Sequence, residues 1–570
     1  MRRNNDTYRE NYVHNYVKVN KSTVVMTIIV LSTLYATVVV SIAVLNGILV
    51  PSSEISNKIL NQAYAQQKEN SNASNLNNLQ LKIIDGIASG DITNDSVVIW
   101  SRVNHAAQMN VEYFPISNSS NLLSQTAQAN KTTDYTAHVK LEDLQPDTRY
   151  NYHVSFIPLL NNSNKKEMRH SDFVNGTFKT APFPSKEQTV NFVVGGDLGG
   201  QRYCKRVDIG YPIFTVINEL SPDFFVSNGD MIYADNDCPI SGPQGTVGWK
   251  NIPGNFRNIT DPIVNWENRT QLSNLYLKHW EYNKSDKHYQ NLLSNVPMYS
   301  QADDHEVADD YSGKSEFYKI PSKDRKGFPN LIKEGLGVFF NFSPIERNPE
   351  EPLRIYRSFQ WGKDLELFLL DAHQYRSAGY LPETPENNKT LLGNKQMEWL
   401  KKGLLNSDAT WKAIITDVPI TIPNCFNSEE DGCDNWATDG FVNQTFTKER
   451  AELFKFLDDN NINNVISIVT DTHYPANIMV KEDANGDGDI ITLYEFVSGP
   501  LNAGTYGPNL LDPTINAKYL YTESGFFNFG HYTVKRDDNG ISHFISEIRT
   551  SDGLVRPSSH LDLVAASKEK

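Results

Sequence analysis

The chain has few cysteines and no excess of positive charge. Only four cysteines occur in 570 residues, and none belongs to a CxxC pair of the kind that binds zinc. Lysine and arginine number 53 against 68 aspartate and glutamate residues, which gives a formal net charge of −15 and a pI near 5.4. Such a chain has no broad positive surface for nucleic acid or anionic lipid. Specific nucleic-acid binding is therefore not expected, and an anionic substrate needs a local positive site.

One long stretch lacks charge altogether. Residues 23–45 contain no charged side chain and are long enough to cross a bilayer as a helix. The preceding segment 1–21 is polar and carries Arg2, Arg3, Arg9, Lys18 and Lys21. We therefore expect a cytoplasmic basic tail at 1–21, a transmembrane helix or signal anchor at 22–50, and everything after it outside the cell. A small-x-small pattern at Ala63 and Ala65 leaves signal cleavage open, so the protein is either bound to the cell surface or secreted.

The segment 51–80 is rich in asparagine, glutamine and serine and predicts a flexible stalk. The four cysteines would then lie in an oxidising space. Cys425 and Cys433 are close enough in sequence to close a small loop, which leaves Cys204 and Cys238 as the other natural pair. Three connectivities are nevertheless possible.

The remaining chain is too long for one ordinary domain. Residues 81–182 contain short β-type runs between Asn, Asp, Gly and Pro turns, without a helical period, and predict a small β-sandwich. Within it, LEDLQPDTRYNYHV (141–154) resembles the end of a fibronectin type III-like domain. From 189 to 550, apolar runs that predict strands alternate with amphipathic segments that predict helices at 211–220, 395–405 and 448–458, which is typical of an α/β fold. The predicted strands include NFVVGG, DFFVSN, LELFLLD, WKAIIT and VISIVT. Residues 551–570 are expected to be a tail.

Acidic and imidazole residues follow several predicted strands of 189–550. In open α/β sheets ligands bind beyond the carboxyl ends of the strands, so we expect these side chains to converge. Like charges held together require a cation between them, and two cations sharing a carboxylate would activate water against a phosphate ester. The residues concerned are Asp197 in NFVVGGDLGG, Asp230 and Tyr233 in SNGDMIYAD, Asp304 and His305 in QADDHEVADDY, and Asp471 and His473 in VISIVTDTHYPA.

These blocks, in this order, resemble the calcineurin-like metallophosphoesterase superfamily, whose pattern is D…GD…GNH[ED]…GHxH. They are more closely similar to the alkaline phosphatase D (PhoD-like) family of secreted phosphatases and phosphodiesterases. The segments that carry the similarity are DGIASGDITNDSVVIWSRV, the DDHE block, LDAHQYR, WKAIITDVP and DNWATDGF. The resemblance implies a four-layer metallophosphoesterase-type β-sandwich flanked by helices, preceded by the fibronectin III-like domain. It also implies metal-dependent hydrolysis of small phosphate mono- or diesters.

The resemblance further implies a role for each site residue. His305 would donate a proton to the leaving group or hold the phosphate, and Arg376 would bind the phosphate through two hydrogen bonds. A tyrosine beside carboxylates suits Fe(3+), and many carboxylate oxygens suit Ca(2+), with Zn or Mn as alternatives. The implied ligands are Asp197, Asp230, Tyr233 and His473 for the first ion, and Asp304 and Asp471 with the bridging Asp230 for the second.

Three features leave alternatives open. The family usually has cysteine where Asp197 stands, as purple acid phosphatases have aspartate, so a harder site is expected and the metals are not settled. Asp417 is either a metal-proximal group or an ordinary strand-end carboxylate. DANGDGDIITLYE (483–495) begins like a calcium-binding loop, but its acid comes one residue late, and we predict a β-hairpin turn instead. The alternative function is a catalytically inactive metal-binding protein of the cell surface.

Overall fold

A computed structural model describes residues 80–159, 170–313, 327–384, 386, 389–426 and 432–566. The predicted basic tail, the transmembrane segment at 22–50 and almost all of the predicted stalk lie outside these ranges. Within the ranges that are described, no helix combines the length and the apolar character needed to cross a bilayer.

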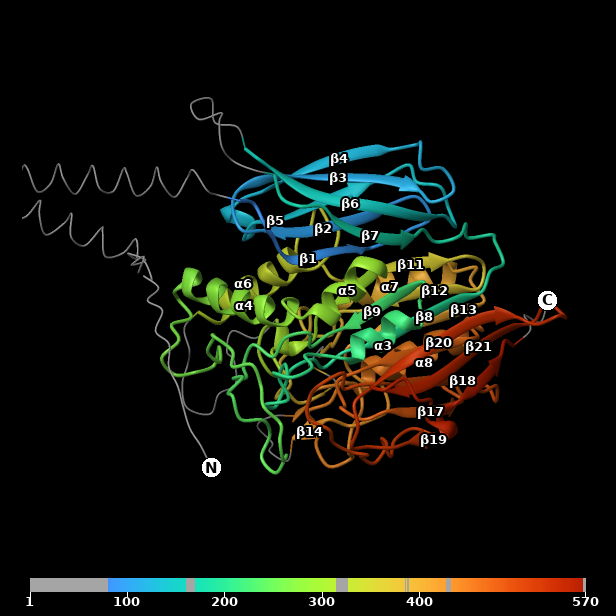
Figure 1. The fold of residues 1–570 in the computed structure, drawn as a ribbon. Helices are drawn as coiled ribbons and strands as arrows, with labels where there is room; N and C mark the ends of the chain where they lie inside the picture. Colours follow the sequence, from blue (N-terminus) through green and yellow to red (C-terminus); the bar gives the residue numbers. More distant parts are fainter. Residues whose placement is uncertain are drawn as a thin grey trace, which may run out of the picture. The chain divides into compact units, whose positions relative to one another are not determined.

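The larger of the two main sheets has nine strands in the order β22-β21-β20-β8-β9-β10-β1-β2-β5 (Figure 1). The strands β8, β9 and β10 are parallel neighbours, whereas β20 pairs antiparallel with β8. The predicted strands NFVVGG and DFFVSN are β8 and β9. The bounds are β22 Leu561–Val564, β21 Ser542–Thr550, β20 Asn528–Arg536, β8 Val190–Gly195, β9 Phe224–Asn228, β10 Met298–Gln301, β1 Ile83–Gly90, β2 Val97–Val103 and β5 Thr136–Leu141.

The smaller main sheet has seven strands in the order β11-β12-β13-β16-β18-β17-β19. Its strands β12, β13, β16 and β18 are parallel, and the predicted strands LELFLLD, WKAIIT and VISIVT are the first three of them. β17 and β18 pair from Glu482 with Ile491, which confirms the hairpin turn predicted at 483–490. The bounds are β11 Arg357–Trp361, β12 Leu365–Leu369, β13 Trp411–Thr416, β16 Val465–Val469, β18 Ile491–Val497, β17 Ala476–Glu482 and β19 Ala517–Thr522.

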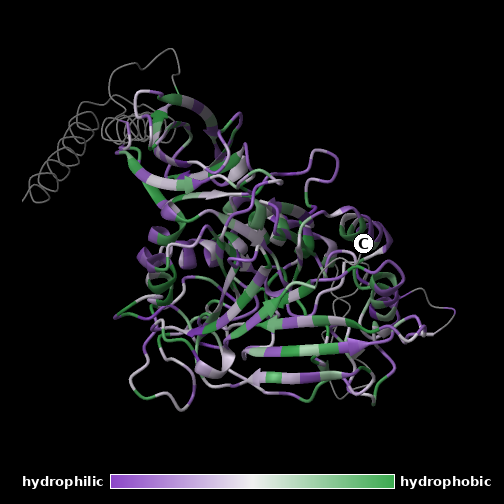
Figure 2. Cartoon of the chain, turned by 90° about the vertical axis from the view of Figure 1, so that its right-hand side faces the viewer, coloured by the Kyte–Doolittle hydropathy of each residue, from purple (hydrophilic) through white to green (hydrophobic). Residues whose placement is uncertain are grey.

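The two main sheets pack face to face, with helices on their outer sides. Neighbouring residues of a strand point to opposite faces, so Phe192 joins the core between the sheets, whereas Val193 packs under helices. In the same way, Leu367 joins the core between the sheets, whereas Phe368 packs under helices on the outer side. On strand β21, buried residues alternate with half-buried ones, and Figure 2 shows strands along which hydrophobic and hydrophilic residues alternate. The predicted four-layer α/β core is therefore confirmed.

Six helices in the described residues form the outer layers. Side chains of α3 to α6 pack with the outward face of the nine-stranded sheet, and those of α7 and α8 pack with that of the seven-stranded sheet. The helices predicted at 211–220, 395–405 and 448–458 are α3, α7 and α8. The bounds are α3 Ile213–Glu219, α4 Arg269–Lys284, α5 Lys287–Asn295, α6 Phe328–Phe342, α7 Asn394–Asn406 and α8 Thr447–Asp459.

The N-terminal part forms the predicted β-sandwich. A four-stranded sheet, β4-β3-β6-β7, packs its apolar side chains with those of β1, β2 and β5. The Tyr150 hydroxyl accepts a hydrogen bond from the Gln145 backbone N–H at 2.9 Å, which fixes the corner before β6 in the manner of immunoglobulin-like sandwiches. β1 also pairs with β10 at Gly90 and Met298, so half of the sandwich continues the nine-stranded sheet. The bounds are β4 Leu123–Ala129, β3 Ala107–Pro115, β6 Arg149–Pro158 and β7 Val174–Lys179.

Two disulfides join Cys204 to Cys238 and Cys425 to Cys433. They are the natural pairs expected from the spacing. The second bridge links the two short strands β14 (Cys425–Phe426) and β15 (Gly432–Cys433). Disulfides form and persist mainly in oxidising compartments, as expected for an exported protein.

Candidate metal centre

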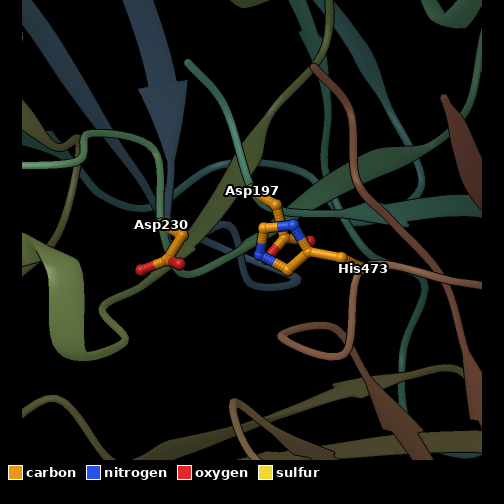
Figure 3. A group of neighbouring side chains, drawn as sticks. All are labelled: Asp197, Asp230 and His473. Carbon is orange, nitrogen blue, oxygen red and sulfur yellow. The ribbon is translucent and has the colours of Figure 1, made fainter. Parts of the chain in front are cut away.

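The loops that follow three strands bring predicted ligands together. Asp197 follows β8, Asp230 follows β9 and His473 lies beyond β16. One ligand atom of each lies within 4.8 Å of the other two, and all three side chains are buried. Figure 3 shows them entering the site from three separate loops. Asp230 also forms a second such group with Asp304 and His305, so it lies where two groups of ligands meet.

Four residues of the centre have a left-handed backbone conformation, which is unfavourable for any residue other than glycine. Asp197, Asp230, Asp471 and His473 have φ angles of 61°, 54°, 64° and 60°. A left-handed backbone costs a non-glycine residue about 1–3 kcal/mol and is concentrated at functional sites. A Cβ atom at Gly499 would lie 2.3 Å from Asp197 Oδ2, so only glycine leaves room for this carboxylate. Holding these side chains in place therefore lowers the stability of the fold.

The Asp197 carboxylate lacks adequate hydrogen-bond partners. Neither oxygen of Asp197 receives a well-formed hydrogen bond within the described ranges, although the Asp471 backbone N–H faces it. Burial raises the pKa of Asp197, Asp230 and Asp471 well above the usual value for a carboxyl group. For Asp197 and Asp471, the negative charge of Asp303 is the next largest cause. A bound cation would remove this penalty, so the donor set fits a metal ion. Asp471 itself is half-buried and belongs to none of the groups that meet within 4.8 Å in the described residues.

His473 has the protonation state of a metal ligand. Its Nδ1 lies 2.5 Å from the Gly504 carbonyl oxygen, which can only accept, so Nδ1 carries the proton and Nε2 has the lone pair. Burial lowers the pKa of His473 to about 4, so the ring is neutral at neutral pH. Nε2 lies 3.5 Å from Asp197 Oδ1 and 2.9 Å from the Tyr233 hydroxyl. The Tyr233 hydroxyl therefore lies beside the same nitrogen as Asp197. Burial, and next the charge of Asp230, raise the pKa of Tyr233.

His305 lies at the edge of the centre and is oriented by Asp235, a residue that was not predicted from the sequence. The His305 Nδ1 atom lies 2.7 Å from Asp235 Oδ1. Its Nε2 atom lies 3.9 Å from Asp304 Oδ1 and 4.0 Å from Asp230 Oδ2. Burial lowers the pKa of His305, but these three carboxylates outweigh it and raise the pKa well above its ordinary value. Without bound cations, these carboxylates therefore favour the protonated form of the His305 ring.

Arg376 is buried and bound to Asp434. Its Nη1 donates to the Asp434 carbonyl oxygen at 2.9 Å and also to the Asp434 carboxylate. Its Nε is buried without a hydrogen-bond partner in the part of the chain described. Burial lowers the pKa of Arg376, and Asp434 and Asp310 raise it above the usual value. Arg376 therefore lies among the carboxylates of Asp434 and Asp310. Its contact with phosphate stays a prediction.

Glu306 holds two loops of the centre. Its buried carboxylate accepts hydrogen bonds from the backbone N–H groups of Asp230, Met231 and Asp303 at 2.9, 2.7 and 2.9 Å. We expect Glu306→Ala to lower the free energy of unfolding by about 3 kcal/mol or more, because these buried donors lose their acceptor. Urea unfolding measures the change, with the exposed Glu398→Ala as control. A change below about 1 kcal/mol would contradict this role of Glu306.

Comparisons with known proteins point to one family. A family model described as PhoD-like phosphatase matches residues 192–539, and one for the N-terminal domain of PhoD-like phosphatases matches 68–182. Alkaline phosphatase D of Bacillus subtilis (strain 168) is 24% identical over 453 residues, which cover 74% of this chain and 70% of that protein.

Two solved structures share the fold. The structure of PhoD matches with a TM-score of 0.63 and 18% identity, and the match covers 85% of this chain and 93% of that one. Purple acid phosphatase PPD1 from yellow lupin (Lupinus luteus) matches with a TM-score of 0.53 and 16% identity, over 84% of this chain and 73% of that one.

Proposed function

Because the chain belongs to the PhoD-like phosphatase family, we propose that it is an exported, metal-dependent hydrolase of small phosphate mono- or diesters. The observation that supports this most is the convergence of Asp197, Asp230 and His473 on one buried point. The two disulfides support a place outside the cytoplasm. Attachment to the membrane through residues 22–50 is part of the same proposal.

Two ions belong to the proposed centre. When bound, they neutralise phosphate charge and lower the pKa of a water molecule. Hard oxygen donors and a tyrosine favour Fe(3+) for the first ion, and a carboxylate-rich set favours Ca(2+) for the second, with Zn or Mn as alternatives. We assign Asp197, Asp230, Tyr233 and His473 to the first ion, and Asp230, Asp304 and Asp471 to the second.

The remaining groups handle the proton and the phosphate. His305 is the proton donor to the leaving oxygen, because its Nε2 faces the ligands Asp230 and Asp304. Asp235 positions His305 through Nδ1. Arg376 orients the phosphate as the family resemblance implies, and its Nε has no hydrogen-bond partner within the described residues.

A chromogenic phosphate monoester and a matched diester test the function. We expect purified, metal-loaded protein to hydrolyse at least one of them, and His305→Gln to lower kcat by about 10²- to 10³-fold because general acid catalysis is lost. The exposed His560→Gln serves as control, and elemental analysis verifies that each variant retains its metals. If the metal-loaded protein hydrolyses neither ester, the proposal fails and a metal-binding surface protein without turnover is favoured.

A further inference from the structure

An exposed aromatic ring lies directly beside a proposed metal ligand. Tyr506 is 53% exposed, yet its ring centroid lies 5.0 Å from that of His473, at an interplanar angle of 40°. Its backbone N–H also donates a hydrogen bond to the His473 carbonyl oxygen at 3.2 Å. Single exposed tyrosines on a protein surface need no explanation. Tyr506 differs from them because it contacts the proposed centre while much of its surface stays open to solvent.

The loop that carries Tyr506 is held on both sides of this residue. Before it, the Gly504 carbonyl oxygen lies 2.5 Å from His473 Nδ1. After it, the Asn509 backbone N–H donates a hydrogen bond to the Tyr474 hydroxyl at 3.0 Å. The position of the Tyr506 ring is therefore set before a substrate binds. A contact with such a ring costs less conformational entropy than a contact with a free side chain.

Tyr506 lies on the same side of the centre as His305. The His305 ring centroid is 4.2 Å from that of Tyr233, and the Tyr233 hydroxyl lies 2.9 Å from Nε2 of His473. Burial raises the pKa of Tyr506 most, and the charges of His305 and Asp309 are the next causes, the first lowering it and the second raising it. Because His305 is the proposed proton donor to the leaving oxygen, the leaving group is the part of a substrate that Tyr506 can contact.

The chemistry of the ring indicates which leaving group fits. Aromatic rings attract one another in offset or edge-to-face arrangements, beyond the apolar area that they bury. We propose that Tyr506 forms an aromatic wall of the substrate site and stacks on a flat leaving group. This inference rests on the proposed function and narrows its substrate class. Phosphate esters whose leaving group carries an aromatic ring are preferred over esters of saturated alcohols of the same size.

Two phosphonates test the aromatic wall without depending on turnover. Benzylphosphonate and cyclohexylmethylphosphonate both carry a CH2 group in place of the ester oxygen, and they differ in whether the six-membered ring is flat. Titration calorimetry on the metal-loaded, full-length protein measures the Kd of each. We expect the wild type to bind benzylphosphonate more tightly. Burial of apolar area alone favours the opposite order, because the saturated ring is the more apolar one.

Variants of Tyr506 separate stacking from general packing. Tyr506→Leu should raise the Kd of benzylphosphonate about 3- to 10-fold and change that of cyclohexylmethylphosphonate by less than about 2-fold. Tyr506→Phe should restore the lost affinity, because its ring can still stack. Phe183→Leu is the control: Phe183 is exposed and precedes the start of β8, whereas Asp197 follows the end of that strand. Elemental analysis verifies that each variant retains its metals.

Four results would overturn the inference. The wild type could bind neither phosphonate, or bind the saturated one at least as tightly. Tyr506→Leu could weaken both equally, which would mean that Tyr506 only packs on His473, or it could weaken neither.

Hydrolysis of phenyl and cyclohexyl phosphate esters is scored separately. Hydrolysis without a ring preference that depends on Tyr506 refutes only this inference. Such a preference in phosphonate binding, without hydrolysis of any ester, refutes only the proposed function.

Discussion

Replacing Asp230 by asparagine should lower kcat for phosphate ester hydrolysis by about 10³-fold or more while the protein stays folded. Asp230 belongs both to the group with Asp197 and His473 and to the group with Asp304 and His305. Asparagine has the same shape but no charge, and its amide nitrogen repels a cation. One substitution therefore weakens both ion sites of the proposed centre.

The measurement for Asp230→Asn is kcat on a mono- and a diester, together with the metal content of the same sample. Asp489→Asn, an exposed change in the β17–β18 hairpin, is the matched control. Thermal unfolding shows whether the variant is folded. Full activity of metal-loaded Asp230→Asn would show that hydrolysis does not depend on this carboxylate.

Removal of the metals should abolish hydrolysis and destabilise the fold. A ligand that binds only the folded state at about 1,000 times its Kd contributes about 4 kcal/mol. Chelation is therefore expected to lower Tm by roughly 5–15 °C, and re-addition of the ions should restore both Tm and activity. An unchanged Tm and unchanged activity after complete removal of metal would contradict the proposed centre.

The chelated protein should also lose stability as pH rises. The pKa values of Asp197, Asp230 and Asp471 are raised in the folded state, chiefly by burial. A raised folded-state pKa contributes stability at pH values below the unfolded value near 4, and this stability is lost as pH rises through the folded value. Tm of the metal-free protein should thus fall as pH rises above about 4, whereas metal affinity should rise because the ligands release protons. Scanning calorimetry with and without ions checks both trends, and a Tm that rises with pH in the metal-free protein would contradict the first.

The parts of the fold that were predicted correctly have local signals. Strands such as β8, β9 and β16 are apolar runs that end at an aspartate, and their helices show amphipathic periods. β10 has only four residues, Met298–Gln301, and carries little pattern of its own. The pairing of Gly90 with Met298, which makes the sandwich continuous with the larger sheet, joins residues far apart in the chain. No local pattern indicates such a pairing.

The residues of the site also differ in whether a local sequence pattern indicates them. The convergence of aspartate and histidine side chains at the strand ends could be predicted, because strand order brings them to one edge of a sheet. Asp235 follows Asp230 by five residues and is indistinguishable in sequence from a surface acid until His305 is placed against it. Glu306 acts through backbone groups of neighbouring loops, so its environment depends on the assembled core.

The sharpest test of the proposed metal centre is an anomalous difference map from crystals of the metal-loaded protein. We predict strong peaks within bonding distance of Asp197, Asp230 and His473, with the iron signal next to the Tyr233 oxygen. A map with well-ordered side chains and no peak among these residues would show that they bind no metal ion.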